Sequence, residues 1–121
     1  MIYYAHSKLD YNTKQEQDDL ILLHSLYGEV VDPKEIEPSL YGAAGYNHMK
    51  PYLDAVKSCK MLVLRCHIFP YVGKGAFCEM CWALAFGKPC VVFNEVNILV
   101  PLNGIVLHEI TDWKIRYGRV M

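Results

Sequence analysis

Short apolar runs along the chain predict four strands. The runs 1–5 ("MIYYA"), 61–66 ("MLVLRC") and 89–93 ("PCVVF") are too short for helices, and aliphatic and aromatic residues dominate them, which is typical of buried strands. The stretch 29–33 ("EVVDP") predicts a further short strand, which ends at a proline. Longer stretches with a helical character separate these runs.

Three helices are predicted between the strands, over residues 13–27, 48–59 and 75–87. The first begins with a capping-box pattern, in which Thr13 is the N-cap and Glu16 reaches back to the start of the helix. The third is apolar on nearly every side, and a glycine followed by a proline marks its end. Strands therefore alternate with helices along the chain.

This alternation predicts a single α/β domain over residues 1–121, built on a doubly wound parallel sheet of four or five strands. Residues 34–47 contain two glycines and a proline and show no period, so a long loop is expected there. Loops of this size often carry function. Residues 105–117 fit either a pair of strands or one edge strand.

Composition places the chain among compact globular proteins, with 121 residues and 53% hydrophobic residues. A net charge of −1 argues against a basic surface for a nucleic-acid polymer. The first residues lack a signal-peptide pattern, and no apolar run is long enough for a membrane span. We therefore expect a soluble cytoplasmic protein, in the host cytoplasm if the chain is viral. The five cysteines predict reduced core residues.

Candidate chemistry gathers where the predicted strands end, since ligands bind outside the carboxyl ends of strands in such sheets. These ends carry His6, Ser7, His67 and Asn94. Glu79 is the one charged residue between Gly75 and Gly87. A carboxylate in so apolar a helix is costly to bury without a partner or a role. The preceding Gly-Lys-Gly leaves backbone N–H groups free to meet an anion, and the helix N-terminus favours the ionised carboxylate that a nucleophile needs.

Three stretches together resemble a known family. They are "IYYAHS" at the first strand, "YLDAVKSCKMLVLR" leading into the third strand, and "GKGAFCEMCWALAFGKP" at the third helix. In order and spacing they are similar to the nucleoside 2-deoxyribosyltransferase family, which includes small nucleotide N-glycosidases and phage-type members. The resemblance runs through roughly residues 1–94. The Gly-x-Gly-x-x-x-Glu pattern followed by Gly-Lys-Pro is its most specific part.

The resemblance implies a flavodoxin-like fold and cleavage of an N-glycosidic bond, with no metal and no organic cofactor. Glu79 would attack the anomeric carbon and form a glycosyl-enzyme ester, as in retaining glycosidases. Tyr3 would orient that carboxylate, Ser7 would contact a 5′-phosphate, and Gly73 with Gly75 would form the loop on the phosphate side. Family members usually form homo-oligomers in which a neighbour completes the site, so the same is expected here.

The chain departs from the family pattern at the general acid. The family usually has an aspartate near the place of Lys50–Tyr52, where this sequence has no carboxylate. Asp54 is the nearest candidate acid, although it is out of register, and His67 or His48 are alternatives. His6 stands where the family commonly has glycine. Without an acid, departure of the base would lose a contribution of about 10²–10⁴-fold.

Several alternatives therefore stay open. The leading hypothesis is a nucleoside or nucleotide N-glycosidase or deoxyribosyltransferase. The second is a non-catalytic binder that sequesters a nucleotide-derived immune signal such as an ADP-ribose derivative, and the third is a structural protein that keeps only the fold. Tyr41 and Tyr46, in the glycine-containing loop, are candidates for stacking on a base. The Cys78-x-x-Cys81 pair is interpreted as helix packing, with a zinc or redox site as the alternative.

Overall fold

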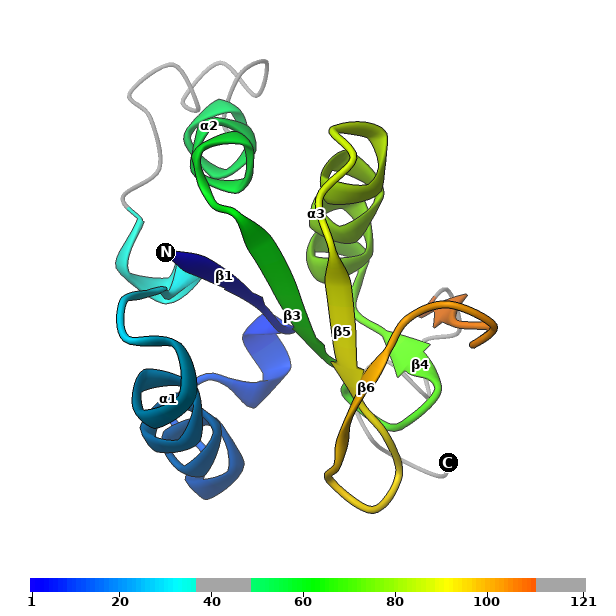
Figure 1. Ribbon diagram of the computed structural model, residues 1–121. Helices are drawn as coiled ribbons and strands as arrows, with labels where there is room; N and C mark the ends of the chain where they lie inside the picture. Colours follow the sequence, from blue (N-terminus) through cyan, green and yellow to red (C-terminus); the bar gives the residue numbers. More distant parts are fainter. Residues whose placement is uncertain (37–48, 111–121) are drawn as a thin grey trace.

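The computed structural model describes residues 1–36 and 49–110. A central sheet contains five strands in the order β2-β1-β3-β5-β6 (Figure 1). The strands are β1 (Ile2–Ala5), β2 (Val30–Val31), β3 (Met61–Arg65), β5 (Cys90–Phe93) and β6 (Leu99–Pro101). The first four are parallel to one another, whereas β6 is antiparallel to β5. This arrangement confirms the predicted α/β fold with a doubly wound, flavodoxin-like sheet.

Three helices connect the strands of this sheet: α1 (Lys14–Tyr27), α2 (Lys50–Ser58) and α3 (Lys74–Ala85). Two short 3₁₀ helices, η1 (Lys8–Asp10) and η2 (Pro33–Glu35), follow β1 and β2. A separate pair of short parallel strands joins β4 (Tyr71–Val72) to β7 (His108–Glu109). None of the described helices combines the length and the apolar character needed to cross a membrane.

The sheet is covered on both faces, by α1 on one side and by α2 and α3 on the other (Figure 1). Successive strand residues point to opposite faces, so the core divides into two clusters. Tyr3 packs with residues of α2 and α3, whereas Tyr4 packs with Leu23 of α1. The neighbouring tyrosines of β1 thus serve different layers of the molecule, as expected from the period of a strand.

Local sequence explains where the helices begin. Thr13 caps α1, because its side chain accepts a hydrogen bond from the Glu16 N–H. The Glu16 carboxylate reaches back to the N–H of Asn12, one residue before the position expected for a capping box. In α2, Pro51 occupies the first turn, where a missing N–H is harmless. This helix begins at Lys50, two residues later than predicted.

The predictions differ from the structure in three further places. The strands β4 and β6 were not predicted, because runs of two or three residues carry no readable period. The predicted tail element is represented by β7, while residues 111–117 lie outside the described residues. All five cysteines are free, but Cys81 is exposed on the outside of α3, so the prediction of a core position is wrong for that residue.

Candidate active site

A cavity of about 720 Å³ lies at the carboxyl end of β1. Its walls come from five places: the loop and 3₁₀ helix after β1, η2, the start of α2, the N-terminal half of α3, and the residue after β7. The lining residues are His6, Ser7, Lys8, Leu9, Tyr11, Pro33, Met49, Tyr52, Gly73, Lys74, Gly75, Ala76, Cys78, Glu79 and Ile110. The size is sufficient for a nucleoside-sized ligand.

Glu79 forms part of the wall of this cavity, where its residue surface is only 3% exposed. Among the described residues, Tyr3 is the hydrogen-bond partner of its carboxylate, to which the phenol O–H of Tyr3 donates. Burial raises the pKa of Glu79 to about 7, although the hydrogen bond from Tyr3 acts in the opposite direction. The sequence predicted that the N-terminus of the helix would favour the ionised form of Glu79. Glu79 lies in the second turn of α3, and there burial has the larger effect and raises its pKa.

Two further tyrosines surround this carboxylate. Tyr11, after η1, and Tyr52, in α2, both line the cavity, and the negative charge of Glu79 contributes to raising the pKa of each phenol. Burial is the larger cause in both cases. At neutral pH these side chains are therefore neutral phenols, able to donate hydrogen bonds and to stack on a planar ligand.

The two glycines before Glu79 have different structural roles. A Cβ atom on Gly73 would lie 2.8 Å from Cβ and 2.9 Å from Oγ of Ser7, so only glycine allows α3 to approach the loop after β1 this closely. Nothing lies within 4 Å of the corresponding position on Gly75, which faces open space in the cavity. Ser7 itself caps η1, since its Oγ accepts a hydrogen bond from the N–H of Leu9.

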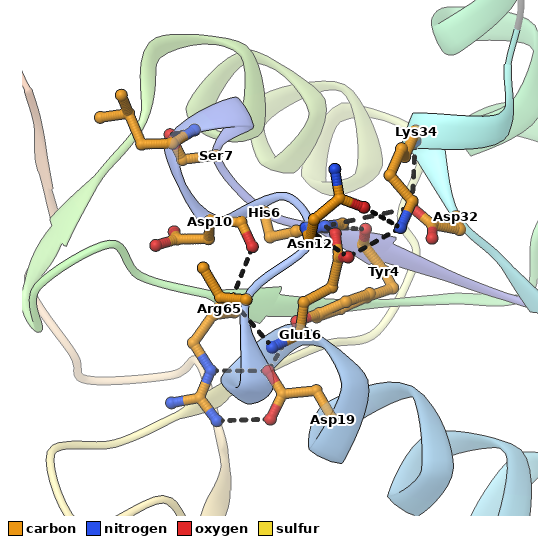
Figure 2. Close-up of polar contacts among 12 residues, drawn as sticks. Tyr4, His6, Ser7, Asp10, Asn12, Glu16, Asp19, Asp32, Lys34 and Arg65 are labelled. Carbon is orange, nitrogen blue, oxygen red and sulfur yellow. Dashed lines mark hydrogen bonds and ion pairs between the residues drawn. The ribbon is translucent and has the colours of Figure 1, made fainter.

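His6 is a buried part of the cavity wall and belongs to a polar cluster behind it (Figure 2). Its Nε2 lies 2.6 Å from Oε2 of Glu16 and 4.0 Å from Oδ1 of Asp32. Lys34 completes the cluster with a 2.8 Å ion pair to the other oxygen of Glu16. The ring of His6 stacks on Tyr4, with centroids 4.1 Å apart. His6 is thus held rigidly by groups from α1 and from the segment after β2.

His67 and Asn94 line a second, smaller cavity of about 350 Å³ instead. The Nδ1 atom of His67 lies 2.9 Å from the Asp10 carboxylate, which ties the loop after β3 to η1. The side-chain oxygen of Asn94 accepts hydrogen bonds from Val96 and Ile98 and so shapes the turn between β5 and β6. The structure does not bring these two predicted ligand-binding residues to the cavity of Glu79.

The remaining predicted residues also lie away from Glu79 or outside the description. Asp54 is on the solvent side of α2 in an exposed ion pair with Lys50, and it does not line the cavity. Tyr41, Tyr46 and His48 lie outside the described residues. Of the predicted set, the structure therefore gathers Tyr3, His6, Ser7, Gly73, Gly75 and Glu79 around one cavity.

Sequence reasoning missed the cluster of Glu16, Asp32 and Lys34 behind His6. The interpretation of Glu16 as a capping residue is correct at one oxygen only, because the other oxygen faces His6. Asp32 directly follows β2, as His6 follows β1, and these strands are adjacent and parallel. This shared position at the carboxyl edge was the signal that could have linked the two residues.

Comparison with protein-family models and with curated protein sequences found no match to this chain.

Proposed function

We propose that the protein cleaves the N-glycosidic bond of a nucleoside or nucleotide, or transfers its deoxyribosyl group, with Glu79 as the nucleophile. The observation that carries this proposal is a single buried carboxylate in the wall of a nucleoside-sized cavity, oriented by a tyrosine hydroxyl. The family resemblance of the sequence supports the same chemistry. The carboxyl edge of a doubly wound sheet is also the usual place for such a ligand.

In the proposed reaction a carboxylate oxygen of Glu79 attacks the anomeric carbon, and the bond from that carbon to the base nitrogen breaks. The base leaves with a proton, and a glycosyl ester on Glu79 remains. Water or a second base then attacks the same carbon and regenerates the carboxylate. Tyr3 keeps the attacking group in one orientation throughout. Attack requires the ionised form, so activity is expected to rise as the pH passes about 7.

The carboxyl group that would give a proton to the departing base is absent from the described wall of the cavity, where His6 is already engaged with Glu16. Glu79 is the only carboxyl group that the described residues contribute to the lining of the cavity. Tyr11 and Tyr52 offer hydroxyl protons there, but burial raises the pKa of both phenols, which makes them weak acids. We propose that the protein forms a homo-oligomer in which a second copy of the chain supplies the missing acid. We also propose that it acts in the cytoplasm, where nucleosides and nucleotides occur.

The same observation supports a second candidate function. A cavity whose described wall holds one well-oriented carboxylate and no second carboxyl group can bind a nucleotide-derived ligand and release it unchanged. The protein would then sequester a small signal, such as an ADP-ribose derivative, rather than cleave it. The aromatic walls and the N-terminal residues of α3 would serve a binder as well as an enzyme.

The experiment is an incubation of the protein at pH 8 with nucleosides, nucleotides and ADP-ribose derivatives, followed by chromatography before and after denaturation. Release of free base is expected, with its loss in Glu79→Gln and a decrease of about a hundredfold in Tyr3→Phe, where the carboxylate is no longer oriented. Glu95→Gln is the control, because Glu95 is an exposed carboxylate at the same edge of the sheet but in the other cavity.

Each result favours one function. Base release that survives in Glu79→Gln would overturn the role of Glu79. Recovery of an intact ligand only after denaturation would support the binder and contradict the enzyme. If no ligand is cleaved or retained by either the protein or its Glu95→Gln control, neither proposed function stands.

A further inference from the structure

We infer that His6, Glu16 and Asp32 form a binding site for a divalent transition-metal ion of the zinc class, directly behind the wall of the Glu79 cavity. The three residues come from different elements, namely the residue after β1, the first turn of α1 and the residue after β2. All three are buried, and one ligand atom from each lies within 4.8 Å of the others. Figure 2 shows the group together with Lys34, which lies beside it.

The orientation of the imidazole ring supports this inference. Nδ1 of His6 lies 3.1 Å from the backbone carbonyl oxygen of Tyr4, which can only accept, so Nδ1 carries a hydrogen. Nε2, on the other side of the ring, donates a hydrogen bond to the Glu16 carboxylate at 2.6 Å and lies 4.0 Å from Asp32. A metal ion takes the place of that hydrogen and is bound by the lone pair of Nε2. A ring nitrogen fixed by a backbone carbonyl on its far side is the usual arrangement of a histidine that binds a metal.

The distances suit one ion after small side-chain movements. A zinc ion lies about 2.0–2.2 Å from nitrogen and oxygen ligands, so two ligands of one ion are at most about 4.3 Å apart. The contacts of His6 Nε2, at 2.6 and 4.0 Å, fall inside that limit, whereas the three ligand atoms together lie within 4.8 Å of one another. The two carboxylates therefore have to shift by a few tenths of an ångström around one ion. Stacking of the imidazole on Tyr4 keeps the nitrogen in place while the carboxylates adjust.

The charges of the cluster identify what now balances the two carboxylates. Lys34 lies 2.8 Å from Glu16, and its side chain is 30% exposed, whereas that of Glu16 is fully buried. The hydrogen that His6 Nε2 donates to Glu16 supplies the second positive charge. A divalent cation that replaces this hydrogen and displaces Lys34 offsets both carboxylates. Because Lys34 reaches the cluster from the solvent side, it can move outward when an ion enters, and it competes with that ion for Glu16.

The ligand types select the metal. Calcium and magnesium prefer oxygen atoms alone, whereas an imidazole nitrogen with two carboxylates suits zinc and similar transition metals. The site is also independent of the cysteines, none of which belongs to this cluster of described residues. This separation matters for the test, because free thiolates bind the same metals.

The test is a titration of the purified protein with Co²⁺, followed by absorption, and with Zn²⁺, followed by equilibrium dialysis. We expect one ion per chain with a Co²⁺ spectrum that lacks a thiolate charge-transfer band. Affinity should fall at least tenfold in His6→Gln and remain unchanged in His24→Gln, the matched control for an exposed histidine on α1. In Lys34→Met, affinity should rise several-fold, since the competing ammonium is absent.

Two results would overturn the site. One is that neither the wild-type protein nor Lys34→Met binds Co²⁺ or Zn²⁺ at a site without thiolate ligands. The other is binding that His6→Gln leaves intact. Lys34→Met keeps the test decisive if His6→Gln fails to fold, because the Lys34 side chain is partly exposed and its removal should leave the core in place. Unchanged or weaker affinity in that variant would contradict the proposed competition.

Discussion

At the scale of single residues, the stability of the fold and the proposed reaction favour different protonation states of Glu79. Burying a carboxylate disfavours its ionised form, which is why its pKa rises to about 7. The hydrogen bond from Tyr3 stabilises the anion and offsets part of that cost. The same residue is therefore unfavourable for folding in the form that the proposed reaction requires, a relation often found at functional sites.

This conflict predicts a pH-dependent stability. The pKa of Glu79 rises from 4.5 to about 7 on folding. The contribution of the protonated side chain to the unfolding free energy is therefore complete below about pH 4.5 and is lost as the pH rises through about 7. Glu79→Gln should match the wild type near pH 4.5 and exceed its unfolding free energy at pH 8 by up to about 3 kcal/mol. Urea unfolding at both pH values measures the difference. If the unfolding free energies of Glu79→Gln and the wild type differ by the same amount at both pH values, the raised pKa is contradicted. Glu95→Gln serves as the exposed control.

At the scale of elements, the start of α3 determines the shape of the cavity. Gly73 lets the helix approach Ser7 closely, and Gly75 leaves the space above the helix open. Since α3 also contacts β1, β3 and β5, its position places Glu79 against Tyr3. A sequence pattern of two glycines thus combines a packing role with a role in leaving room for a ligand.

These two glycines form a matched pair for mutation. Gly73→Ala should lower the unfolding free energy by about 1–3 kcal/mol, because the new methyl group collides with Ser7. Gly75→Ala should keep or slightly raise stability, since alanine favours the helix by up to about 1 kcal/mol, but it should weaken ligand binding by filling the cavity. Thermal unfolding and the KM for base release measure the two effects. Equal loss of stability in both variants would contradict these different roles.

At the scale of the whole molecule, the helices on the two faces of the sheet differ in the contacts that they make. On one face, α2 and α3 line the Glu79 cavity together with the segments after β1 and β2, whereas on the other face α1 is joined to the sheet by buried polar contacts (Figure 2). Asp19 of α1 accepts two hydrogen bonds from Arg65 of β3, at 2.8 and 2.7 Å. It accepts a third, of 2.6 Å, from Tyr4 of β1. These contacts fix α1, and with it Glu16, against the sheet.

Removal of this tie should be costly. Asp19→Ala leaves the buried guanidinium of Arg65 without its charge partner, and we expect a loss of about 3–5 kcal/mol of unfolding free energy. Asp54→Ala is the control, because its ion pair with Lys50 is exposed and should contribute less than about 0.5 kcal/mol. Urea denaturation of the two variants compares them directly. A similar small loss in both would show that the buried pair does not hold the layers together.

The sequence by itself determined the α/β class, the parallel strands β1, β3 and β5, and the approximate extents of α1, α2 and α3. It could do so because apolar runs, caps and glycine stops act over a few neighbouring residues. It also singled out Glu79, since a lone carboxylate in an apolar helix is visible without any fold, whereas Tyr3 was expected only from the family resemblance. The short strands β4 and β6 remained unpredicted, because their pairing depends on contacts between distant segments.

Only the tertiary structure decided which candidates share one site. His67 and Asn94 also follow strands, yet the loops after β3 and β5 direct them to a second cavity, and Asp54 faces solvent. Burial by the surrounding layers, rather than the position in the helix, determined the pKa direction of Glu79. The contacts of His6 with Glu16 and Asp32 bring together three chain segments. Such effects depend on distance in space, which no local pattern of residues records.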